Sequence, residues 1–264
     1  MISSLSPADR AKFAASRAAL SLVEPDMKLG LGTGSTANWF VRLLGERMRM
    51  EKFRLTAVAT STRTADLARA QGIEVVSLDS AGWLDLTIDG ADEVDPALTL
   101  IKGGGGAHLQ EKIVASASDR MVVITDSSKL VDTLGAFPLP LEVIPFGWRS
   151  TRAIVEEMLE QIDVDGRAVS PRMDGDELYR TDEGNHILDL HLGRIGDAHR
   201  LSPILNQVPG VVENGLFLGI CDQVMVGYTS GEAHLLEEGG IMRPVAFTDG
   251  IDGDAFVGRI LAEA

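Results

Sequence analysis

Short apolar runs alternate with amphipathic stretches along the first half of the chain, and this alternation predicts its elements. Runs rich in branched and apolar residues predict strands at residues 28–31, 55–59, 74–77, 84–88 and 121–125. Apolar residues at helical spacing predict helices at residues 7–23, 36–49, 62–71 and 109–117. Strands and helices in alternation are typical of a parallel sheet covered by helices. We therefore predict an α/β fold with a parallel sheet in this part of the chain.

The pattern changes in the middle of the chain, where prolines interrupt the alternation. Residues 137–145 contain three prolines, and an acidic stretch follows them. Within that stretch the pattern predicts a helix at 150–161 and a strand at 187–192. We predict a second, smaller α+β domain at residues 138–211.

The chain after this domain is predicted to return to the first sheet. Apolar runs at 215–221 and 223–228 predict two strands that join it. The first domain then comprises residues 1–137 and about 212–236. Residues 237–264 are rich in Gly and Asp with little periodicity, so we predict a C-terminal extension of uncertain structure.

Acidic residues outnumber basic ones, and the excess is unevenly distributed. The 264 residues include 24 Lys and Arg against 39 Asp and Glu, a formal net charge of −15. Nucleic acids and anionic membranes are bound through clustered basic side chains, so this excess argues against both partners. Residues 1–141 hold 15 basic and 17 acidic side chains, so most of the excess lies after them. A locally positive pocket for a small anion is therefore compatible with the first part of the chain.

Cysteine use and hydropathy indicate the compartment. The only cysteine, Cys221, allows no disulfide within the chain and no cysteine cage for zinc. No segment approaches 18 consecutive apolar residues, and the N-terminus lacks the apolar core of an export signal. We expect a cytoplasmic protein with no membrane partner.

A glycine-rich segment, GLGTGST at residues 30–36, lies between an expected strand and an expected helix. Closely spaced glycines let a backbone approach a ligand, and the amides at a helix start favour an anion. The hydroxyls of Thr33, Ser35 and Thr36 add donors suited to phosphate. The dinucleotide fingerprint would need Gly in place of Ser35, and the P-loop would need a Gly-Lys-Ser/Thr triplet. The segment predicts a phosphate-binding loop, with a tight turn capped by hydroxyls as the alternative.

Carboxylates follow the expected strand at 84–88, in the sequence DGADEVD at 89–95. Open α/β sheets bind their ligands at the carboxyl ends of strands, so Asp89 and Asp92 can both face a ligand. They can bind a divalent metal or act as acid, base and hydroxyl acceptor. The calcium-loop pattern is absent and no His lies nearby, so we favour the role without a metal. A solvated acidic turn is the alternative for Glu93 and Asp95.

Four consecutive glycines follow Lys102, directly before the expected helix at 109–117. A loop that contacts a ligand through its backbone fits this position better than a flexible linker does. Lysine is scarce in the chain, and a cation at Lys102 can stabilise an oxyanion or neutralise a phosphate. Glu111 falls in the first turns of the helix, where it can point back toward the loop.

A fourth polar segment, TDSSK at 125–129, ends the strand expected at 121–125. Each of the four segments follows an expected strand of the sheet, so we expect the four loops to converge on one crevice. Together they offer phosphate donors, two carboxylates and two lysines, Lys102 and Lys129. This combination predicts a site for a small phosphorylated anion rich in hydroxyls.

The same segments, in this order and spacing, resemble the type A ribose-5-phosphate isomerases. The segments are GLGTGSTA at 30–37, DGADEVD at 89–95, KGGGGA at 102–107 with EK at 111–112, SSK at 127–129, FPLPLEVIP at 137–145 and VPGVVENGLF at 208–217. The resemblance implies a Rossmann-like domain with a smaller α+β domain, and interconversion of ribose 5-phosphate and ribulose 5-phosphate in the pentose phosphate pathway. It also implies no metal, no organic cofactor and a homodimer or larger homo-oligomer.

The resemblance also implies a role for each matching residue. Glu111 would move the proton between C2 and C1 through an enediol, and Asp89 would assist opening of the sugar ring. Lys102 and the glycine amides would stabilise charge on the carbonyl oxygen, while Asp92 would orient the hydroxyls. The phosphate would lie on residues 33–36 and Lys129, and a contact with Lys12 is left open. The implied substrate-binding residues are Thr33, Gly34, Ser35, Thr36, Asp89, Gly90, Ala91, Asp92, Lys102, Gly103, Gly104, Gly105 and Lys129.

Two other kinds of function are alternatives to the isomerase. A noncatalytic sugar-phosphate sensor would work beside a DNA-binding module, which the acidic composition disfavours. A CoA transferase or sugar-phosphate deaminase would share the glycine-rich loops but not the full series of segments. The chain departs from the family pattern at Gly106, where the family more often has Ala, and after about Glu237, where no counterpart is evident.

Overall fold

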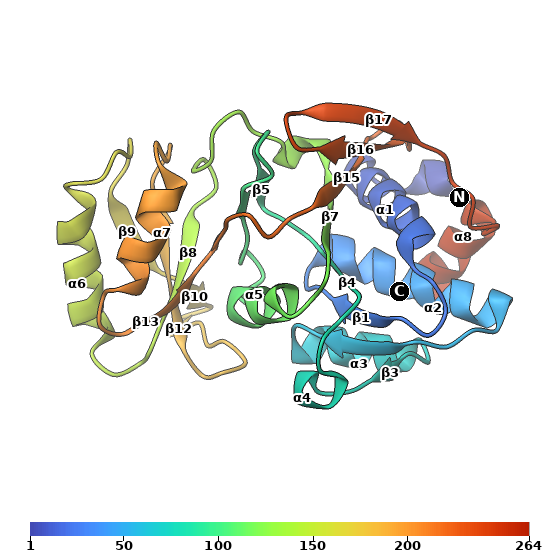
Figure 1. Cartoon of the computed structure of the whole chain (residues 1–264), viewed down its shortest axis with the longest axis horizontal. Helices are drawn as coiled ribbons and strands as arrows, with labels where there is room; N and C mark the ends of the chain where they lie inside the picture. Colours follow the sequence, from blue (N-terminus) through green and yellow to red (C-terminus); the bar gives the residue numbers. More distant parts are fainter. Residues whose placement is uncertain (264) are drawn as a thin grey trace. The chain divides into compact units, whose positions relative to one another are not determined.

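The computed structural model describes residues 1–263, which form two compact units. The first unit comprises residues 1–90, 117–128 and the chain from Asp222 onward. The second comprises residues 91–116 and 129–221. Figure 1 labels the elements of both units along the chain.

An eight-stranded sheet forms the centre of the first unit, with the strand order β17-β16-β15-β7-β4-β1-β2-β3. The strands from β15 to β3 pair in parallel, whereas β16 and β17 are antiparallel to their neighbours. The strands are β1 (Lys28–Leu31), β2 (Thr56–Ala59), β3 (Glu74–Val75), β4 (Leu86–Asp89), β7 (Met121–Asp126), β15 (Gln223–Gly227), β16 (Ala233–Glu237) and β17 (Ile241–Val245). The helices are α1 (Pro7–Ala19), α2 (Ser35–Glu51), α3 (Thr62–Ala70), α4 (Leu78–Ala81) and α8 (Gly253–Glu263), with short 3-10 turns at Ile2–Ser4 and Leu20–Leu22.

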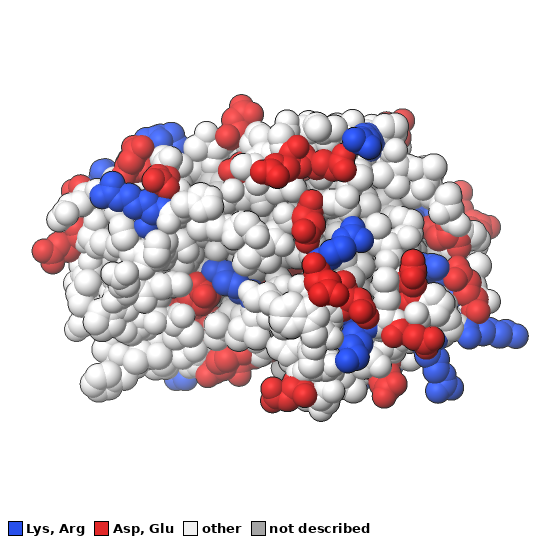
Figure 2. All heavy atoms as spheres, viewed as in Figure 1, with Lys and Arg blue, Asp and Glu red and all other residues white. Residues whose placement is uncertain are grey.

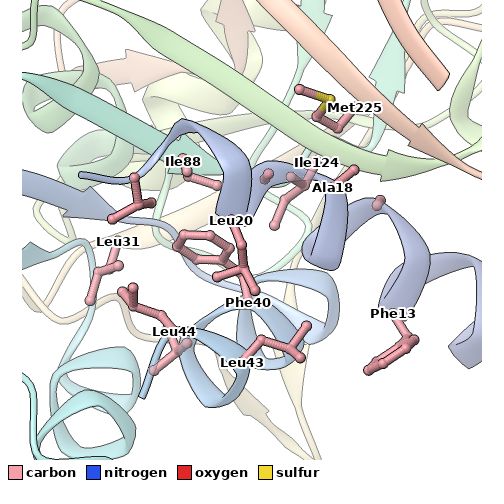
Figure 3. Packing of buried hydrophobic residues seen from close by; sticks show 14 of the residues in the cluster. Phe13, Ala18, Leu20, Leu31, Phe40, Leu43, Leu44, Ile88, Ile124 and Met225 are labelled. Atoms are coloured by element: carbon pink, nitrogen blue, oxygen red, sulfur yellow. The ribbon is translucent and has the colours of Figure 1, made fainter. Parts of the chain in front are cut away.

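Helices α1 and α2 pack on the sheet because each of them buries an apolar face. Ser6 caps α1 by accepting the Asp9 N–H, and Pro7 occupies the first turn. Figure 3 shows the resulting core, in which α2 side chains meet apolar side chains of the sheet. The labelled residues are Phe13, Ala18, Leu20, Leu31, Phe40, Leu43, Leu44, Ile88, Ile124 and Met225. Burial of this apolar surface stabilises the sheet. Because the strands from β15 to β3 are parallel, their carboxyl ends lie at one edge of it.

The extension predicted after residue 237 is part of the first unit over its described residues. β17 pairs with β16, and α8 follows it. Asp249 forms a part-buried ion pair with Arg17 of α1, with 2.8 Å between Oδ2 and Nε. Phe256 and Val257 of α8 lie in the core. The sequence pattern missed these elements because β17 is a largely exposed edge strand with no clear alternation.

The second unit is an α+β unit with three small sheets. Their strand orders are β13-β8-β12-β9, β14-β6-β5 and β10-β11, all antiparallel. The strands are β5 (Glu93–Val94), β6 (Leu100–Ile101), β8 (Leu139–Val143), β9 (Ala168–Pro171), β10 (Met173–Asp174), β11 (Glu177–Leu178), β12 (His186–His191), β13 (Val211–Asn214) and β14 (Leu216–Phe217). The helices are α5 (His108–Ser116), α6 (Trp148–Leu159) and α7 (Ala198–Asn206). α6 and α7 share an apolar core with the four-stranded sheet.

The two units divide the chain differently from the predicted domains. Residues 91–116 were expected in the first domain but lie in the second unit, where β6 pairs with β5 on one side and with β14 on the other. For the same reason, the run at 215–221 does not return to the first sheet. The run at 223–228 does return, since β15 pairs with β7.

The surface charge follows the composition. Figure 2 shows acidic side chains, with fewer basic ones among them, over the visible face. This distribution agrees with the formal net charge of −15. Within residues 1–263, no helix is both long and apolar enough to span a membrane.

Candidate functional site

The residues predicted for the site form two groups, one in each unit. The first unit holds Thr33, Gly34, Ser35, Thr36, Asp89 and Gly90. The second holds Ala91, Asp92, Lys102, Gly103, Gly104, Gly105, Glu111 and Lys129. The chain passes from one group to the other at the peptide bond between Gly90 and Ala91.

The predicted phosphate-binding loop connects β1 to the start of α2. Gly34 is the N-cap of α2, with φ +127°, and no side chain caps the helix there. Ser35 begins the helix with an exposed side chain, and Thr36 is half-buried. The amides of a first helical turn have no partner within the helix and carry the positive end of its dipole. This geometry is suited to an anion.

The Thr33 hydroxyl, which the sequence predicted as a phosphate donor, lies among other hydroxyls. Thr33 is buried, and its Oγ1 lies 2.8 Å from Thr60 Oγ1 and 2.8 Å from Ser61 Oγ. Thr64 Oγ1 donates to the Gly32 carbonyl at 3.1 Å. These hydroxyls support the loop from the turn after β2 and from the first turn of α3. Sequence reasoning missed them, although the polar run TST directly after a strand was an available signal.

Asp89 ends β4 and is fully buried against the same loop. Its Oδ1 accepts the N–H of Thr33 at 3.1 Å and the N–H of Gly90 at 2.6 Å. β4 pairs with β1, so the end of β4 meets the segment that leaves β1. A Cβ at Gly32 would lie 1.9 Å from Asp89 Oδ1 and 2.5 Å from Asp89 Cα. Glycine is therefore required at position 32 to admit the carboxylate.

Replacing Gly32 by Ala is expected to destabilise the first unit and displace Asp89. The added methyl group meets the Asp89 backbone as well as its side chain, so a rotamer change cannot relieve the clash. We expect a loss of about 1–3 kcal/mol in the free energy of unfolding, measured by urea denaturation. Gly258→Ala in α8 is the matched control, since its Cβ would have 3.4 Å to the nearest atom. Equal stability of both variants would contradict this account of the loop.

Three of the four predicted loops do share one edge of the large sheet. They follow β1, β4 and β7, which are neighbours in the parallel sheet. After β7, the Asp126 carboxylate accepts the N–H of Ser128 at 2.9 Å. A short 3-10 turn follows at Ser127–Lys129, and Lys129 is its last residue. The Lys129 Nζ lies 5.9 Å from the Phe137 ring centroid.

The prediction that the glycine loop at residues 102–107 follows a strand of the large sheet was wrong. The loop of residues 102–107 does not follow a strand of the large sheet, but β6 of the three-stranded sheet in the second unit. β6 is only two residues long and pairs antiparallel with β5 and β14. A run of two or three apolar residues does not reveal which sheet it joins. Pattern alone therefore placed the loop on the wrong sheet.

Lys102 and Glu111 form a buried ion pair in the second unit. Their Nζ and Oε2 lie 3.3 Å apart, and the residues are 2% and 3% exposed. Lys102 follows β6, while Glu111 lies in the first turn of α5, so the glycine loop between them brings the two together. The pair is thus a buried carboxylate beside a buried ammonium.

Asp92 is attached to the glycine loop. Its Oδ2 accepts the N–H of Gly104 at 2.7 Å. A Cβ at Gly104 would lie 2.6 Å from Asp92 Oδ1, so the glycine permits this contact. Lys112, the neighbour of Glu111, instead donates to Glu213 Oε1 at 2.9 Å. Asp92, Lys102 and Glu111 are therefore held around one loop.

The described residues offer no candidate metal centre. Among residues 1–263, no three His, Cys, Asp or Glu side chains are grouped as ligands of one ion. The chemistry that the two groups offer is that of helix and loop amides, carboxylates and one buried cation. Such groups can bind a phosphate, transfer a proton and stabilise a developing negative charge.

Comparison with known proteins identifies the family. Residues 56–231 match the family model of ribose 5-phosphate isomerase A (phosphoriboisomerase A). The chain belongs to this family. A ribose-5-phosphate isomerase A from Ruegeria sp. (strain TM1040) is 61% identical over 243 residues, which are 91% of this chain and 93% of the relative.

Solved structures agree with this assignment to the ribose 5-phosphate isomerase A family. Ribose 5-phosphate isomerase A from Methanocaldococcus jannaschii has a TM-score of 0.78 at 42% identity, covering 86% of this chain and 97% of that one. A D-ribose-5-phosphate isomerase in complex with phospho-erythronic acid has a TM-score of 0.80 at 40% identity, covering 87% and 99%. The predicted family, α/β fold class and isomerase class are confirmed. The sensor, CoA transferase and deaminase alternatives are set aside.

Proposed function

We propose that the chain interconverts ribose 5-phosphate and ribulose 5-phosphate through an enediol intermediate. Its family supports this activity, and one solved relative binds phospho-erythronic acid. The carboxylate of that acid shares negative charge between two oxygens, as an enediolate does. The observation that carries the proposal is the buried pair of Lys102 and Glu111 beside a loop of glycine amides.

Glu111 is the proposed proton carrier. In the open aldose, the C2–H is acidified by the adjacent carbonyl, so a carboxylate can remove that proton. The C–H electron pair then forms the C1–C2 double bond, and the carbonyl oxygen at C1 becomes an oxyanion. Return of the proton to C1, with loss of the O2 proton and protonation of O1, gives the ketose. The atoms balance without a redox partner.

Lys102 and the amides of residues 103–105 are the proposed stabilisers of the oxyanion. A buried cation stabilises a developing anion more strongly than a solvated one does, because little water screens it. Asp92, which holds the Gly104 N–H, is the proposed partner of the sugar hydroxyls. Its second oxygen can accept a hydroxyl hydrogen while the first holds the loop.

The first unit is proposed to open the sugar ring and to hold the phosphate. Asp89 would take the proton of the anomeric hydroxyl and return it to the ring oxygen as the bond from C1 to that oxygen breaks. Ring opening must come first, since only the open aldehyde acidifies C2. The start of α2, from Gly34 to Thr36, would hold the phosphate through its amides and hydroxyls. Gly90 and Ala91 join the binding set because they link Asp89 to Asp92. The buried Thr33 would contribute by supporting the loop.

Replacing Lys129 by Ala is expected to raise KM for ribose 5-phosphate by about tenfold or more, with little change in kcat. The reason is that a charge-assisted hydrogen bond to a phosphate contributes mainly to binding. Steady-state kinetics measures both constants. Lys52→Ala is the control, because Lys52 is exposed at the end of α2. An unchanged KM in Lys129→Ala would place the phosphate elsewhere.

We propose that the reaction needs neither a metal nor an organic cofactor. The expected result is full activity after exhaustive treatment with a chelator, because the described residues supply the base, the cation and the amides. The measurement is the rate of ribulose 5-phosphate formation before and after chelation. Lost activity that returns with an added divalent ion would overturn this proposal.

The remaining proposals concern the setting of the enzyme. We propose that it acts in the pentose phosphate pathway, in the cytoplasm, as a homodimer or larger homo-oligomer. The family assignment supports these proposals, and the single cysteine is in keeping with a reducing compartment. Nucleic acid and membranes are not proposed as partners, because basic side chains are too few.

A further inference from the structure

The glycine loop of the second unit is held by a side chain distant from it in sequence. Arg172 lies between β9 and β10, and its Nη1 donates to the Gly103 carbonyl at 2.7 Å and to the Gly104 carbonyl at 3.3 Å. No pattern in the sequence indicates this contact, because Arg172 and Gly104 are 68 positions apart. Arg172 therefore contacts the loop that we assign to oxyanion stabilisation.

Asp189 on β12 fixes the orientation of Arg172. The Arg172 Nε donates to Asp189 Oδ2 at 3.0 Å, and Nη2 donates to Asp189 Oδ1 at 2.5 Å. Their side chains are only 15% and 17% exposed. A bidentate pair of this kind leaves the guanidinium one direction for its remaining donors. That direction is toward the two glycine carbonyls.

Because each peptide group is planar, the direction of a carbonyl also sets the direction of the N–H in the same peptide group. In a trans peptide the N–H points opposite to the C=O. The Gly103 carbonyl faces Arg172, so the Gly104 N–H faces the other side, where Asp92 Oδ2 accepts it at 2.7 Å. The Gly104 carbonyl also faces Arg172, so the Gly105 N–H is turned to the side away from Arg172.

Two further side chains support the same loop. Tyr179 Oη donates to the Gly105 carbonyl at 3.4 Å, and the Arg172 guanidinium lies 5.9 Å from the Tyr179 ring centroid. His108 is fully buried against Gly103, whose Cβ would lie 2.8 Å from Nδ1 of its ring. Burial lowers the pKa of His108 to about 3, so the ring is neutral. The loop thus packs against a neutral imidazole, and Arg172 holds its Gly103 and Gly104 carbonyls.

A purely structural ion pair would not require these contacts. Arg172 uses Nε and Nη2 for Asp189, and its backbone N–H donates to the Ile187 carbonyl of β12 at 2.8 Å, so β12 and the segment between β9 and β10 are linked without Nη1. Nη1 is directed instead to two consecutive carbonyls of a loop without side chains. Glycine peptides rotate with little steric resistance. The Gly106 N–H holds the Gly103 carbonyl from within the loop at 3.0 Å, and Arg172 adds contacts from outside it to the Gly103 and Gly104 carbonyls.

We propose that Arg172, oriented by Asp189, is a positioning residue that turns the amides of the glycine loop toward the oxyanion of the intermediate. This role rests on the proposed isomerase function, in which those amides stabilise that oxyanion. Arg172 itself does not touch the substrate. It acts by keeping the Gly103 and Gly104 carbonyls on its own side of the loop. Asp92 then holds the Gly104 N–H, and the Gly105 N–H is turned toward the charge on the intermediate.

The test compares Arg172→Ala and Arg172→Lys with wild-type enzyme, and Arg180→Ala is the control. Arg180 is exposed in the same region of the second unit. Lysine keeps the charge and favours folding, but one ammonium cannot replace a fork that contacts Asp189 and two carbonyls at once. For each protein we would measure kcat, KM for ribose 5-phosphate, affinity for phospho-erythronic acid by calorimetry, and the effect of millimolar guanidinium on kcat.

We expect both Arg172 variants to lose about 10–100-fold in kcat, with KM changed by less than about threefold. Affinity for phospho-erythronic acid should fall in parallel with kcat. Added guanidinium should restore part of the kcat of Arg172→Ala, whereas Arg180→Ala should behave as wild type. Rescue of this kind is not expected of an arginine that only stabilises the fold.

Two failures can be told apart. If wild-type enzyme is active and the folded Arg172 variants keep kcat within about twofold of it, the positioning role is overturned and the isomerase function stands. If wild-type enzyme forms no ribulose 5-phosphate, the proposed function fails and this role fails with it. Should Arg172→Ala fail to fold, Arg172→Lys decides by the same kcat criterion.

Discussion

Replacing Glu111 by Gln is expected to lower kcat by about 10²–10⁴-fold and to leave the binding of ribose 5-phosphate nearly unchanged. The amide keeps the shape of the side chain but cannot take a proton from C2. Glu111 is 3% exposed, so a carboxylate dissolved in the buffer cannot easily reach its position and take over its role. Steady-state kinetics gives kcat, and calorimetry gives the affinity for ribose 5-phosphate.

The control for this variant is Glu157→Gln. Glu157 is an exposed glutamate on α6 of the same unit, so its replacement should change neither constant. If Glu111→Gln retained wild-type kcat, Glu111 would not be the base. A large rise in KM with unchanged kcat would instead assign Glu111 to substrate binding.

Replacing Lys102 by Met is expected to lower kcat by about 10²–10³-fold, because the oxyanion loses its nearest cation. The variant should also be less stable, since it leaves the Glu111 carboxylate buried without the ammonium 3.3 Å away. Removing one partner of a buried ion pair costs about 3–5 kcal/mol of unfolding free energy. Urea denaturation measures that loss, and initial rates measure kcat.

The double variant Lys102→Met/Glu111→Gln separates the two effects. With the charge at position 111 also removed, stability should return toward that of wild type. Activity should stay as low as in Glu111→Gln, because the base is absent. Lys52→Met at an exposed position is the control for the substitution itself. A fully active Lys102→Met would contradict the proposed role of the cation.

The sequence predicted the parallel sheet of the first unit well. Its strands are apolar and its helices amphipathic, so each element carries its own periodic signal. Lys28–Leu31 was predicted with the bounds that the structure has. The predicted phosphate-binding loop was also placed correctly between a strand and a helix, because Gly34 and the following hydroxyls mark a helix start.

The elements that were misplaced are short or exposed. β6 and β14 have two residues each, too few for an alternating pattern, so their membership of a separate sheet was not evident. β17 is an exposed edge strand with a proline. The partner of a strand depends on long-range pairing, which a periodic pattern does not encode.

The candidate site shows the same limit. Motifs indicated Asp89, Lys102 and Glu111, because each lies beside a glycine-rich or strand-end signal. Arg172 carries no such signal, since a single arginine in an acidic segment is usually a solvated charge. Its contact with the glycine loop depends on how β9 and β12 pair. Packing around a loop is visible only in three dimensions.

The most direct test of the central claim is proton NMR of ribose 5-phosphate incubated with the enzyme in D₂O. A carboxylate that holds the proton during an enediol intermediate exchanges it with solvent, so deuterium should enter C1 of the ketose. We predict formation of ribulose 5-phosphate carrying solvent deuterium at C1, and formation of the ketose by Glu111→Gln that is slower by about 10²–10⁴-fold. Absence of ribulose 5-phosphate with wild-type enzyme, or equal formation by Glu111→Gln, would contradict the account.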